Sequence, residues 1–409
     1  MNATMAGKIA PHPSGLDGLR GKSCVIVAGS IAPYTNRLYD AFAEASGVEL
    51  AVLCCAAVEP QRAWRLPKPS HYEIKTLDGW RQHRSYTSHV YFNPSIISEL
   101  VRRRPTAVMV AGFSPTMVLA AAYAAATRTP LGVMTDGSVE TDPGRNSLVH
   151  WWMRRLIIPR AAAATGASAN SLRLLESYGL KPGRGFVLPI VTPWEPPEHT
   201  PAWDERNYDI LFCGALNEDI KGARFFSEVV TRCKELTGNI RVRIVGDGPL
   251  RSELEARFEA AGIPARFDGF LHGAEVAAAY GSAKLLLFPS RGDAWGLVAS
   301  EAVALGTPVI GSPHAVSSHE LIARHGVGRM CEMNTGLWAK TVADILGDQQ
   351  TWTEMHMQTR QARASFELDK SVRALTSALH RAHGHGPGCP KPSHAMSFAR
   401  FRTGSDTQS

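Results

Sequence analysis

The sequence predicts an α/β protein built from two doubly wound parallel sheets, one in each half of the chain. Short apolar runs of strand length alternate with segments of helical period in both halves, and this alternation is typical of βαβ units. A proline-rich segment at 193–197 separates the halves and is expected to be a stiff linker. The chain has 409 residues, 44% of them hydrophobic and 20% charged, which is enough for two domains that each bury a core.

We expect the first domain to span residues 1–196 and the second to span residues 204–367. A helix over 368–385 follows, with amphipathic spacing from Leu368 to Ala382. Residues 386–409 are rich in Gly, Pro and Ser, so a disordered tail is expected there.

The first domain shows regular strand and helix alternation with one interruption. The expected strands are Cys24 to Ala28, Leu50 to Cys54, one at Ala107, Leu131 to Thr135, one near Ala162, and Phe186 to Leu188. The expected helices are 35–46, 95–103, one at Met117, 147–156 and 167–178. Residues 59–92, rich in Trp, His and Arg, are predicted to be an irregular excursion from this alternation.

A membrane span is the alternative interpretation of residues 105–127, which contain no charged side chain. The segment breaks at Phe113-Ser114-Pro115-Thr116, after a β-like run and before an Ala-rich helical run. Strand, turn and helix therefore account for it better than a span does.

In the second domain, two carboxylates stand eight residues apart across a strand-to-helix junction. Leu285 to Phe288 is a buried strand, Leu297 to Leu305 has helical spacing, and a second buried strand follows at Pro308 to Ile310. Asp293 and Glu301 therefore flank the start of a helix at the carboxyl edge of the sheet, where ligands bind in open α/β folds. Free N–H groups of the helix N-terminus favour a bound diphosphate there.

This pattern resembles the C-terminal signature of family 4 glycosyltransferases, also called glycosyl transferases group 1. These are retaining enzymes of the GT-B fold, in which two Rossmann-like domains face a cleft and a C-terminal helix crosses back to the first domain. In the family, two acidic residues separated by seven others contact a nucleotide-sugar donor, and Asp293 stands here where Glu is usual. Further matching motifs occur in the family's order: Ile210 to Gly214, Lys221-Gly222, Arg243 to Pro249, and Phe267 to Phe270.

The resemblance implies a role for each of three charged residues, and each has a simpler alternative. Glu301 would accept hydrogen bonds from the donor ribose, or it is a solvated helix-face glutamate. Asp293 would contact hydroxyls of the transferred sugar, or it is a helix N-cap. Lys221 would neutralise the leaving diphosphate, or it is a surface lysine. The Arg that relatives carry six residues before this Lys is Ala215 here.

That departure leaves open which groups complete the diphosphate site. Arg224 or Arg291 could substitute, or backbone N–H groups could hold the leaving group. The other expected donor contacts are the loop glycines Gly214, Gly246 and Gly248, then Gly269 and Phe270 beside the base, Ser290 and Gly292 beside the sugar, and Trp295, Gly296 and Leu297 at the helix start. For Trp295, core packing is an equal alternative.

The first domain offers fewer recognisable site residues. Family members commonly have a His after the strand equivalent to Leu131–Thr135, and this chain has Thr135-Asp136-Gly137 instead. Asp136 would take over a sugar contact, or it forms an Asx turn before Gly137. The loop from Gly29 to Tyr34 is expected to face the donor but lacks the family's frequent double glycine.

The basic charge is confined to the first domain. The net charge is +7 with a pI near 9.1, and the whole excess falls in residues 1–200. Arg102-Arg103-Arg104 ends a helix and no nucleic-acid motif is visible, so we expect no nucleic-acid partner. The segment from His150 to Ile158, with Trp151-Trp152 and Arg154-Arg155, suits an anionic membrane surface, or it is a buried amphipathic helix.

The chain has seven cysteines without a C-x-x-C pair and a polar start, and both features favour a cytoplasmic protein. Peripheral attachment to the inner face of the membrane is compatible with this location. The resemblance implies a retaining transferase that moves a sugar from a nucleoside-diphosphate donor to a glycan or glycolipid acceptor, in envelope, exopolysaccharide or lipopolysaccharide synthesis. No cofactor is expected, and no metal, because no Asp-x-Asp motif is apparent. The alternatives are a nucleotide-sugar epimerase or phosphorylase of the same fold, or a non-catalytic nucleotide- or carbohydrate-binding scaffold.

Overall fold

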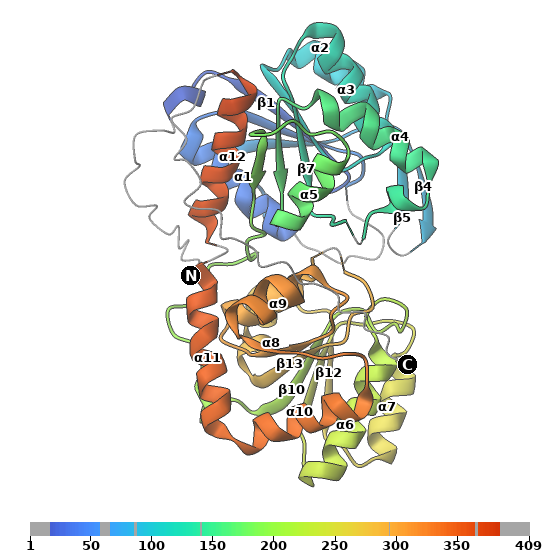
Figure 1. Cartoon of the computed structure of the whole chain (residues 1–409), viewed down its shortest axis with the longest axis vertical. Helices are drawn as coiled ribbons and strands as arrows, with labels where there is room; N and C mark the ends of the chain where they lie inside the picture. Colours follow the sequence, from blue (N-terminus) through green and yellow to red (C-terminus); the bar gives the residue numbers. More distant parts are fainter. Residues whose placement is uncertain are drawn as a thin grey trace, which may run out of the picture.

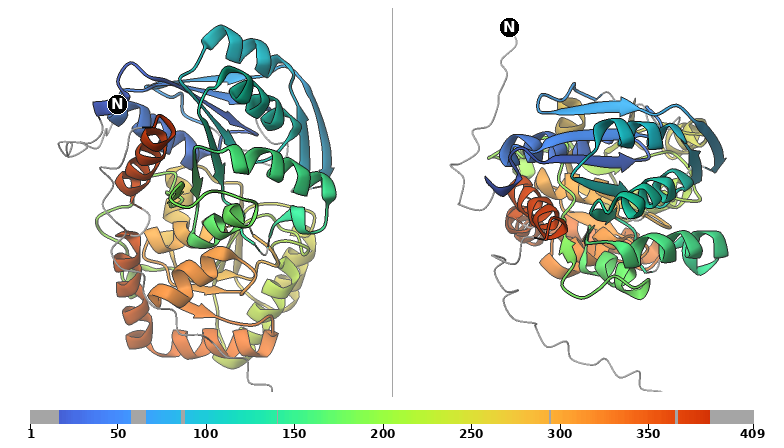
Figure 2. Two further views of the ribbon diagram at one scale, coloured as in Figure 1. Left: turned by 45° about the horizontal axis from the view of Figure 1, so that its top comes forward. Right: turned by 90° about the horizontal axis from the view of Figure 1, so that it is seen from above.

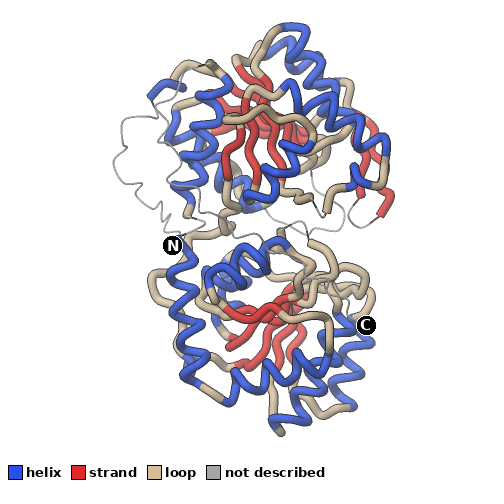
Figure 3. Tube along the Cα trace, in the orientation of Figure 1, coloured by secondary structure: helices blue, strands red, loops and turns tan. Residues whose placement is uncertain are grey.

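The computed structural model describes residues 17–57, 66–85, 88–139, 141–293, 295–364 and 367–384. They form two α/β domains stacked along the long axis of the molecule (Figure 1). Helices flank the strands of each sheet (Figure 3). The two main sheets are parallel throughout, which confirms the predicted doubly wound α/β class.

The first domain contains a seven-stranded sheet in the order β3-β2-β1-β6-β7-β8-β9. Its strands are β1 (Ser23–Ala28), β2 (Glu49–Cys54), β3 (Tyr72–Thr76), β6 (Ala107–Ala111), β7 (Leu131–Thr135), β8 (Ala163–Gly166) and β9 (Gly185–Val187). Its helices are α1 (Pro33–Ser46), α2 (Ser95–Arg103), α3 (Pro115–Thr127), α4 (Leu148–Ile157) and α5 (Ala169–Ser177). The central strands are continuous apolar runs because helices cover both faces of the sheet.

The expectation that residues 59–92 are irregular is wrong where the structure describes them. β3 pairs in parallel with β2 at the sheet edge, and β4 (Trp80–Ser85) and β5 (Ser88–Phe92) form an antiparallel hairpin. Only Tyr72 of β3 is buried, so the strand lacks the apolar run by which central strands are recognised. Residues 59–65, 86 and 87 of the segment lie outside the described residues.

Residues 105–127 fold as strand, turn and helix, as predicted, forming β6 and α3. β6 lies in the middle of the sheet between β1 and β7. No helix among the described residues has both the length and the apolar character needed to cross a bilayer.

The second domain contains a six-stranded sheet in the order β12-β11-β10-β13-β14-β15. Its strands are β10 (Tyr208–Cys213), β11 (Val242–Val245), β12 (Ala265–Gly269), β13 (Ala283–Phe288), β14 (Val309–Gly311) and β15 (Gly328–Met330). Its helices are α6 (Ala223–Thr237), α7 (Arg251–Ala260), α8 (Ala274–Gly281), α9 (Leu297–Ala304), α10 (Thr335–Gly347) and α11 (Gln349–Arg363). The strand order reverses between β10 and β13, so the loops after these two strands lie side by side at the carboxyl edge.

The last described helix, α12 (Leu368–Ala382), returns to the first domain as predicted (Figures 1 and 2). Val372, Leu375 and Leu379 pack in the cluster that also contains Leu38 of α1. The Ser371 hydroxyl donates to the carbonyl of Pro189, 2.8 Å away. The boundaries expected at residues 196 and 204 both fall in the connection between β9 and β10. The expected tail at 386–409 lies outside the described residues.

Candidate functional site

A group of polar side chains lies between the loops that follow β10, β11 and β13. We call the space bounded by residues 214–222, 246–249, 290–293, 295 and 296 the carboxyl-edge site. The Lys221 ammonium lies 2.7 Å from Asp293 Oδ2, although 72 positions separate the two residues. The Ser290 hydroxyl lies 2.7 Å from the same carboxylate oxygen. Both charged side chains keep about a fifth of their surface exposed, so a ligand can reach them.

Lys221 is held by its own loop. The Asn217 side-chain oxygen accepts hydrogen bonds from the N–H groups of Ile220 and Lys221, at 3.3 and 3.0 Å. Gly222 then turns the chain into α6 with φ of 64°, and a side chain there would lie 2.3 Å from the carbonyl oxygen of Pro289. Because the turn excludes any larger residue, Lys221 is fixed beside the loop that carries Asp293.

The glycines of the site serve loop packing in this structure. A Cβ at Gly246 would lie 2.0 Å from the carbonyl oxygen of Gly214, and one at Gly248 would lie 2.7 Å from that of Leu216. The Gly246 N–H donates to the carbonyl of Gly269 at 2.7 Å. Close approach therefore occurs between backbones of neighbouring loops, whereas the sequence suggested close approach by a ligand.

Glu301 lies on α9 and is buried, with 8% of its surface exposed. Its Oε2 accepts a hydrogen bond from the Tyr280 hydroxyl at 2.6 Å. Burial raises the pKa of Glu301 to about 7, and the Tyr280 hydrogen bond opposes this rise. The alternative of a solvated helix-face glutamate is therefore wrong.

Asp293 does not cap α9, so the N-cap alternative is wrong. The cap is Gly296, whose φ of 89° places it in the left-handed region, and a Cβ there would lie 2.5 Å from the Phe288 ring. The Trp295 indole N–H donates to the Ser300 hydroxyl at 2.9 Å. Trp295 and Leu297 pack with Ala167, Ile190, Val316 and Tyr34, which joins the two domains. Packing is thus the observed role of the Trp295 side chain.

The remaining expected contacts line the same edge. Gly269 has φ of 68° and ends β12, and Phe270 after it exposes 53% of its surface, which leaves its ring free to stack on a base. Gly292 has open space where a Cβ would stand.

Neither candidate for the missing cation lacks a partner. Arg224 pairs with Glu253 at 2.7 Å, and Arg291 pairs with Glu218. The Arg291 N–H donates to the carbonyl of Ile220 at 2.8 Å, so this arginine lies next to Lys221 in the loop structure. Arg291 is therefore the better placed of the two.

In the first domain, the turn after β7 is built on threonine hydroxyls. Gly137 N–H donates to Thr135 Oγ1 at 3.2 Å, and Ser138 N–H donates to Thr141 Oγ1 at 3.0 Å. The backbone N–H that an Asx turn of Asp136 would use is thus bonded to another side chain.

The hypothesis that Arg154 and Arg155 of helix α4 both form a basic surface is wrong for Arg154. Arg154 is buried, its Nε lies 2.7 Å from Asp142 Oδ1, and the Tyr178 hydroxyl donates to the other Asp142 oxygen at 2.5 Å. Arg155 lies with its guanidinium 5.7 Å from the Trp151 ring centre. The exposed apolar residues of this helix, which we call the α4 patch, are Leu148, Val149, Trp151, Trp152 and Leu156.

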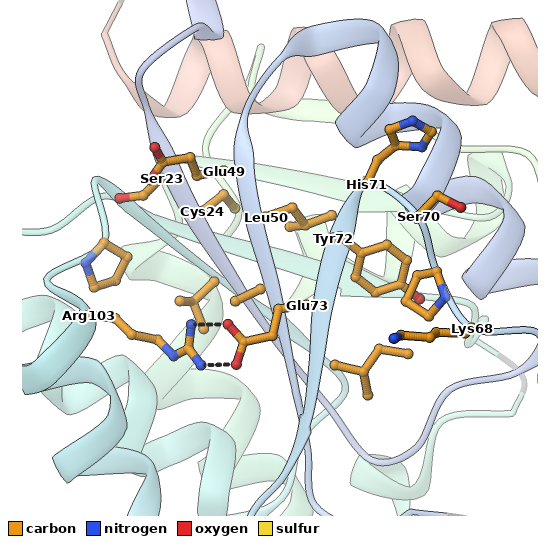
Figure 4. Close-up of a pocket in the computed structure, with 15 residues that line it drawn as sticks. Ser23, Cys24, Glu49, Leu50, Lys68, Ser70, His71, Tyr72, Glu73 and Arg103 are labelled. Atoms are coloured by element: carbon orange, nitrogen blue, oxygen red, sulfur yellow. Dashed lines mark hydrogen bonds and ion pairs between the residues drawn. The ribbon is translucent and has the colours of Figure 1, made fainter.

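A cavity of about 710 Å³ lies elsewhere (Figure 4). It is lined by Ser23, Glu49 and Tyr72, which begin β1, β2 and β3, and so it lies at the amino edge of the first sheet. Glu73 and Arg103 face each other there in a two-bond ion pair. The cavity is separate from the carboxyl-edge site, because it lies at the first sheet and the carboxyl-edge site lies at the second.

Sequence reasoning missed two features of the site. It assigned Lys221 and Asp293 separately, without their ion pair, and it did not single out Tyr280. A buried tyrosine needs a partner for its hydroxyl, so the apolar sequence around Tyr280 was the available signal.

Comparison with known proteins finds sequence similarity in the second domain. Residues 207–348 match the family model of glycosyl transferases group 1. The chain is 33% identical over 125 residues to a 2-deoxystreptamine glucosyltransferase of Streptomyces kanamyceticus, covering 30% of this chain and 29% of that protein. It is 31% identical over 118 residues to a GDP-mannose-dependent alpha-(1-6)-phosphatidylinositol dimannoside mannosyltransferase of Mycobacterium tuberculosis, covering 29% and 30%. The matched part is thus less than a third of either relative's length.

Solved structures share the whole two-domain architecture at low identity. Anabaena HepE in complex with UDP superposes with a TM-score of 0.66 at 13% identity, over 88% of this chain and 99% of that one. WaaG, a glycosyltransferase involved in lipopolysaccharide biosynthesis, superposes with a TM-score of 0.63 at 14% identity, over 87% and 98%. The predicted GT-B fold is confirmed.

Proposed function

Because residues 207–348 match the family model of glycosyl transferases group 1, we propose that this chain transfers a sugar from a nucleoside-diphosphate donor to an acceptor hydroxyl with retention of anomeric configuration. The observation that carries the proposal is the contact between Lys221 and Asp293 at the switch point of the second sheet. It joins a cation suited to a diphosphate with a carboxylate suited to sugar hydroxyls.

In the proposed reaction, the bond between the anomeric carbon and the diphosphate breaks, and its electron pair stays on the diphosphate. The Lys221 ammonium and the N–H groups at the start of α9 stabilise that growing charge more than they stabilise the ground state. The acceptor oxygen attacks from the same side, and its proton passes to a diphosphate oxygen. Asp293 holds sugar hydroxyls and Glu301 holds ribose hydroxyls.

The proposal assigns the positive charge at the diphosphate to protein groups and needs no metal. Ser290 and Gly292 line the sugar position, and Phe270 offers its exposed ring to the base. Two solved neighbours are complexes with UDP or UDP-glucose, which supports a nucleotide-sugar donor.

Screening nucleotide sugars by thermal unfolding tests the donor. A donor present at a hundred times its Kd is expected to stabilise the folded chain by about 2.7 kcal/mol, because it binds only the folded state. The stabilisation and the subsequent turnover should persist in EDTA. The proposal fails if no nucleotide sugar raises the unfolding temperature.

Product analysis separates the proposed transferase from its alternatives. A labelled donor incubated without acceptor would be converted to its epimer by an epimerase, whereas a transferase would leave the sugar intact or hydrolyse it slowly. Donor binding without turnover on any glycan acceptor would indicate a binding scaffold.

We further propose that the acceptor is a glycan or glycolipid at an anionic membrane. The protein would reach it by binding the inner face of that membrane through the α4 patch. Leu148 and Trp152 expose 78% and 57% of their surfaces, and helix α4 lies on the same side of the domain as hairpin β4–β5 (Figure 1). Exposed Trp and Leu beside Arg155 suit the headgroup region of a bilayer. The basic excess of residues 1–200 adds about 1 kcal/mol for each basic residue close to the surface.

Sedimentation with phosphatidylglycerol vesicles is expected to recover the protein at low salt and less of it as salt rises. Trp152→Glu combined with Leu148→Glu should abolish sedimentation and leave donor binding unchanged. Leu236→Glu is the matched control, because Leu236 is an exposed leucine on α6 of the second domain. If the wild-type protein ignores anionic vesicles at low salt, the basic domain serves another acceptor, such as an acidic polysaccharide.

A further inference from the structure

The Tyr280–Glu301 contact links a fully buried phenol to the carboxylate assigned to the donor ribose. Tyr280 lies near the end of α8 with no exposed surface, and its hydroxyl donates to Glu301 Oε2 at 2.6 Å. Burial keeps the pKa of Tyr280 well above its ordinary value, so the phenol is a hydrogen-bond donor at neutral pH. The bond occupies Oε2, and a carboxylate can also accept at its other oxygen.

One contact to its backbone and one to its ring hold Tyr280 in place. The Tyr280 carbonyl accepts a hydrogen bond from the Thr307 hydroxyl at 2.7 Å, and Thr307 in turn accepts one from Arg206 at 2.8 Å. The Tyr280 ring packs 6.4 Å from the Trp194 ring, which belongs to the connection between the domains. A hydroxyl on so constrained a ring can restrict Glu301 to one orientation.

We propose that Tyr280 is a positioning residue whose phenol holds the Glu301 carboxylate in the orientation and charge state that bind donor hydroxyls. The inference rests on the proposed function, since it assigns the ligand of Glu301. It adds a residue outside the matched acidic pair, and it predicts how donor affinity depends on pH.

Two ionisable groups lie near Glu301, and one of them, Tyr280, changes the pKa of Glu301. The Tyr280 hydrogen bond lowers the pKa of Glu301 and so opposes the larger effect of burial. The Cys213 thiol, at the end of β10, has its own pKa raised to about 12 by burial and by the Glu301 charge, so it stays neutral. The positive charge of Lys221, across the site, lowers the pKa of Cys213 but does not outweigh the effect of burial. Tyr280 is therefore the neighbour that favours ionised Glu301.

Tyr280→Phe tests the inference because it removes one hydroxyl and keeps the ring. Carbon-13 NMR of labelled glutamate carboxyls, with Glu301 assigned by Glu301→Gln, should show a higher pKa for Glu301 in the variant. Calorimetry with UDP, GDP and ADP should show roughly tenfold weaker binding of the best nucleotide at pH 7. The loss should shrink toward pH 9, where Glu301 is ionised in both proteins.

Tyr178→Phe is the matched control, because Tyr178 also donates to a buried carboxylate, that of Asp142 in the first domain. It should leave the pH profile of nucleotide binding unchanged. An unaltered Glu301 titration in Tyr280→Phe, or a loss of affinity equal at every pH, would overturn the inference. Wild-type protein that binds none of the three nucleotides would instead overturn the proposed function and with it the assigned ligand, while the NMR titration would still report the hydrogen bond.

Discussion

Replacing Lys221 by alanine is expected to lower turnover of the nucleotide-sugar donor by a factor on the order of a hundred or more. That is the usual cost of deleting one preorganised group that stabilises transition-state charge. Lys221 is fixed at the site by the Asn217 hydrogen bonds and by its ion pair with Asp293, so little reorganisation is needed when charge develops. Release of nucleoside diphosphate from the donor found by thermal screening measures the effect.

The fold is expected to survive this change, since Lys221 and Asp293 are partly exposed. Lys340→Ala is the matched control, because the exposed Lys340 forms an ion pair of similar length, 2.6 Å, with the exposed Asp344 on α10. Ala215→Arg in the Lys221→Ala background should restore part of the turnover by replacing the cation that relatives carry. Wild-type turnover in Lys221→Ala would show that the diphosphate is held elsewhere, with Arg291 as the first candidate.

Replacing Glu301 by glutamine is expected to weaken donor binding by roughly 1–2 kcal/mol while the fold is kept. Glutamine preserves the shape of the side chain and can still accept from the Tyr280 hydroxyl, but it lacks the charge that strengthens bonds to ribose hydroxyls. Calorimetric titration with the donor at pH 8 measures the loss. Unchanged donor affinity would remove Glu301 from the site.

The same substitution should change how stability depends on pH. Burial raises the pKa of Glu301 from 4.5 to about 7 in the folded chain, whereas the unfolded chain keeps the ordinary value. Between these values the unfolded state has lost the proton that the folded state retains, so the free energy of unfolding falls as pH rises. Glutamine does not titrate, so Glu301→Gln should gain roughly 3 kcal/mol relative to wild type from pH 4 to pH 8.

Urea unfolding at the two pH values measures this gain, with exposed Glu354→Gln on α11 as the control that should not show it. A gain at high pH together with lost donor affinity would mean that the chain keeps a destabilising buried carboxylate for binding. An equal effect of Glu301→Gln at both pH values would contradict the raised pKa.

The sequence by itself determined the elements whose two faces are both buried, because such strands read as continuous apolar runs. β1, β7 and β13 were predicted on this basis, and the amphipathic spacing of Leu368–Ala382 predicted α12 at its observed bounds. The motif order also predicted that Lys221, Asp293 and Glu301 belong to one edge of the second sheet. These are properties of local pattern and of chain order, which an amino-acid sequence carries directly.

Only the tertiary structure decided which side chains meet. The strand order brings the β10 and β13 loops together, and the Lys221–Asp293 pair, 72 positions apart, depends on that order and on no local period. Helical spacing could not distinguish buried Arg154 from Arg155, because the partner Asp142 comes from another segment. Likewise the edge strand β3 has a single buried residue, so its pairing with β2, and not its composition, makes it a strand.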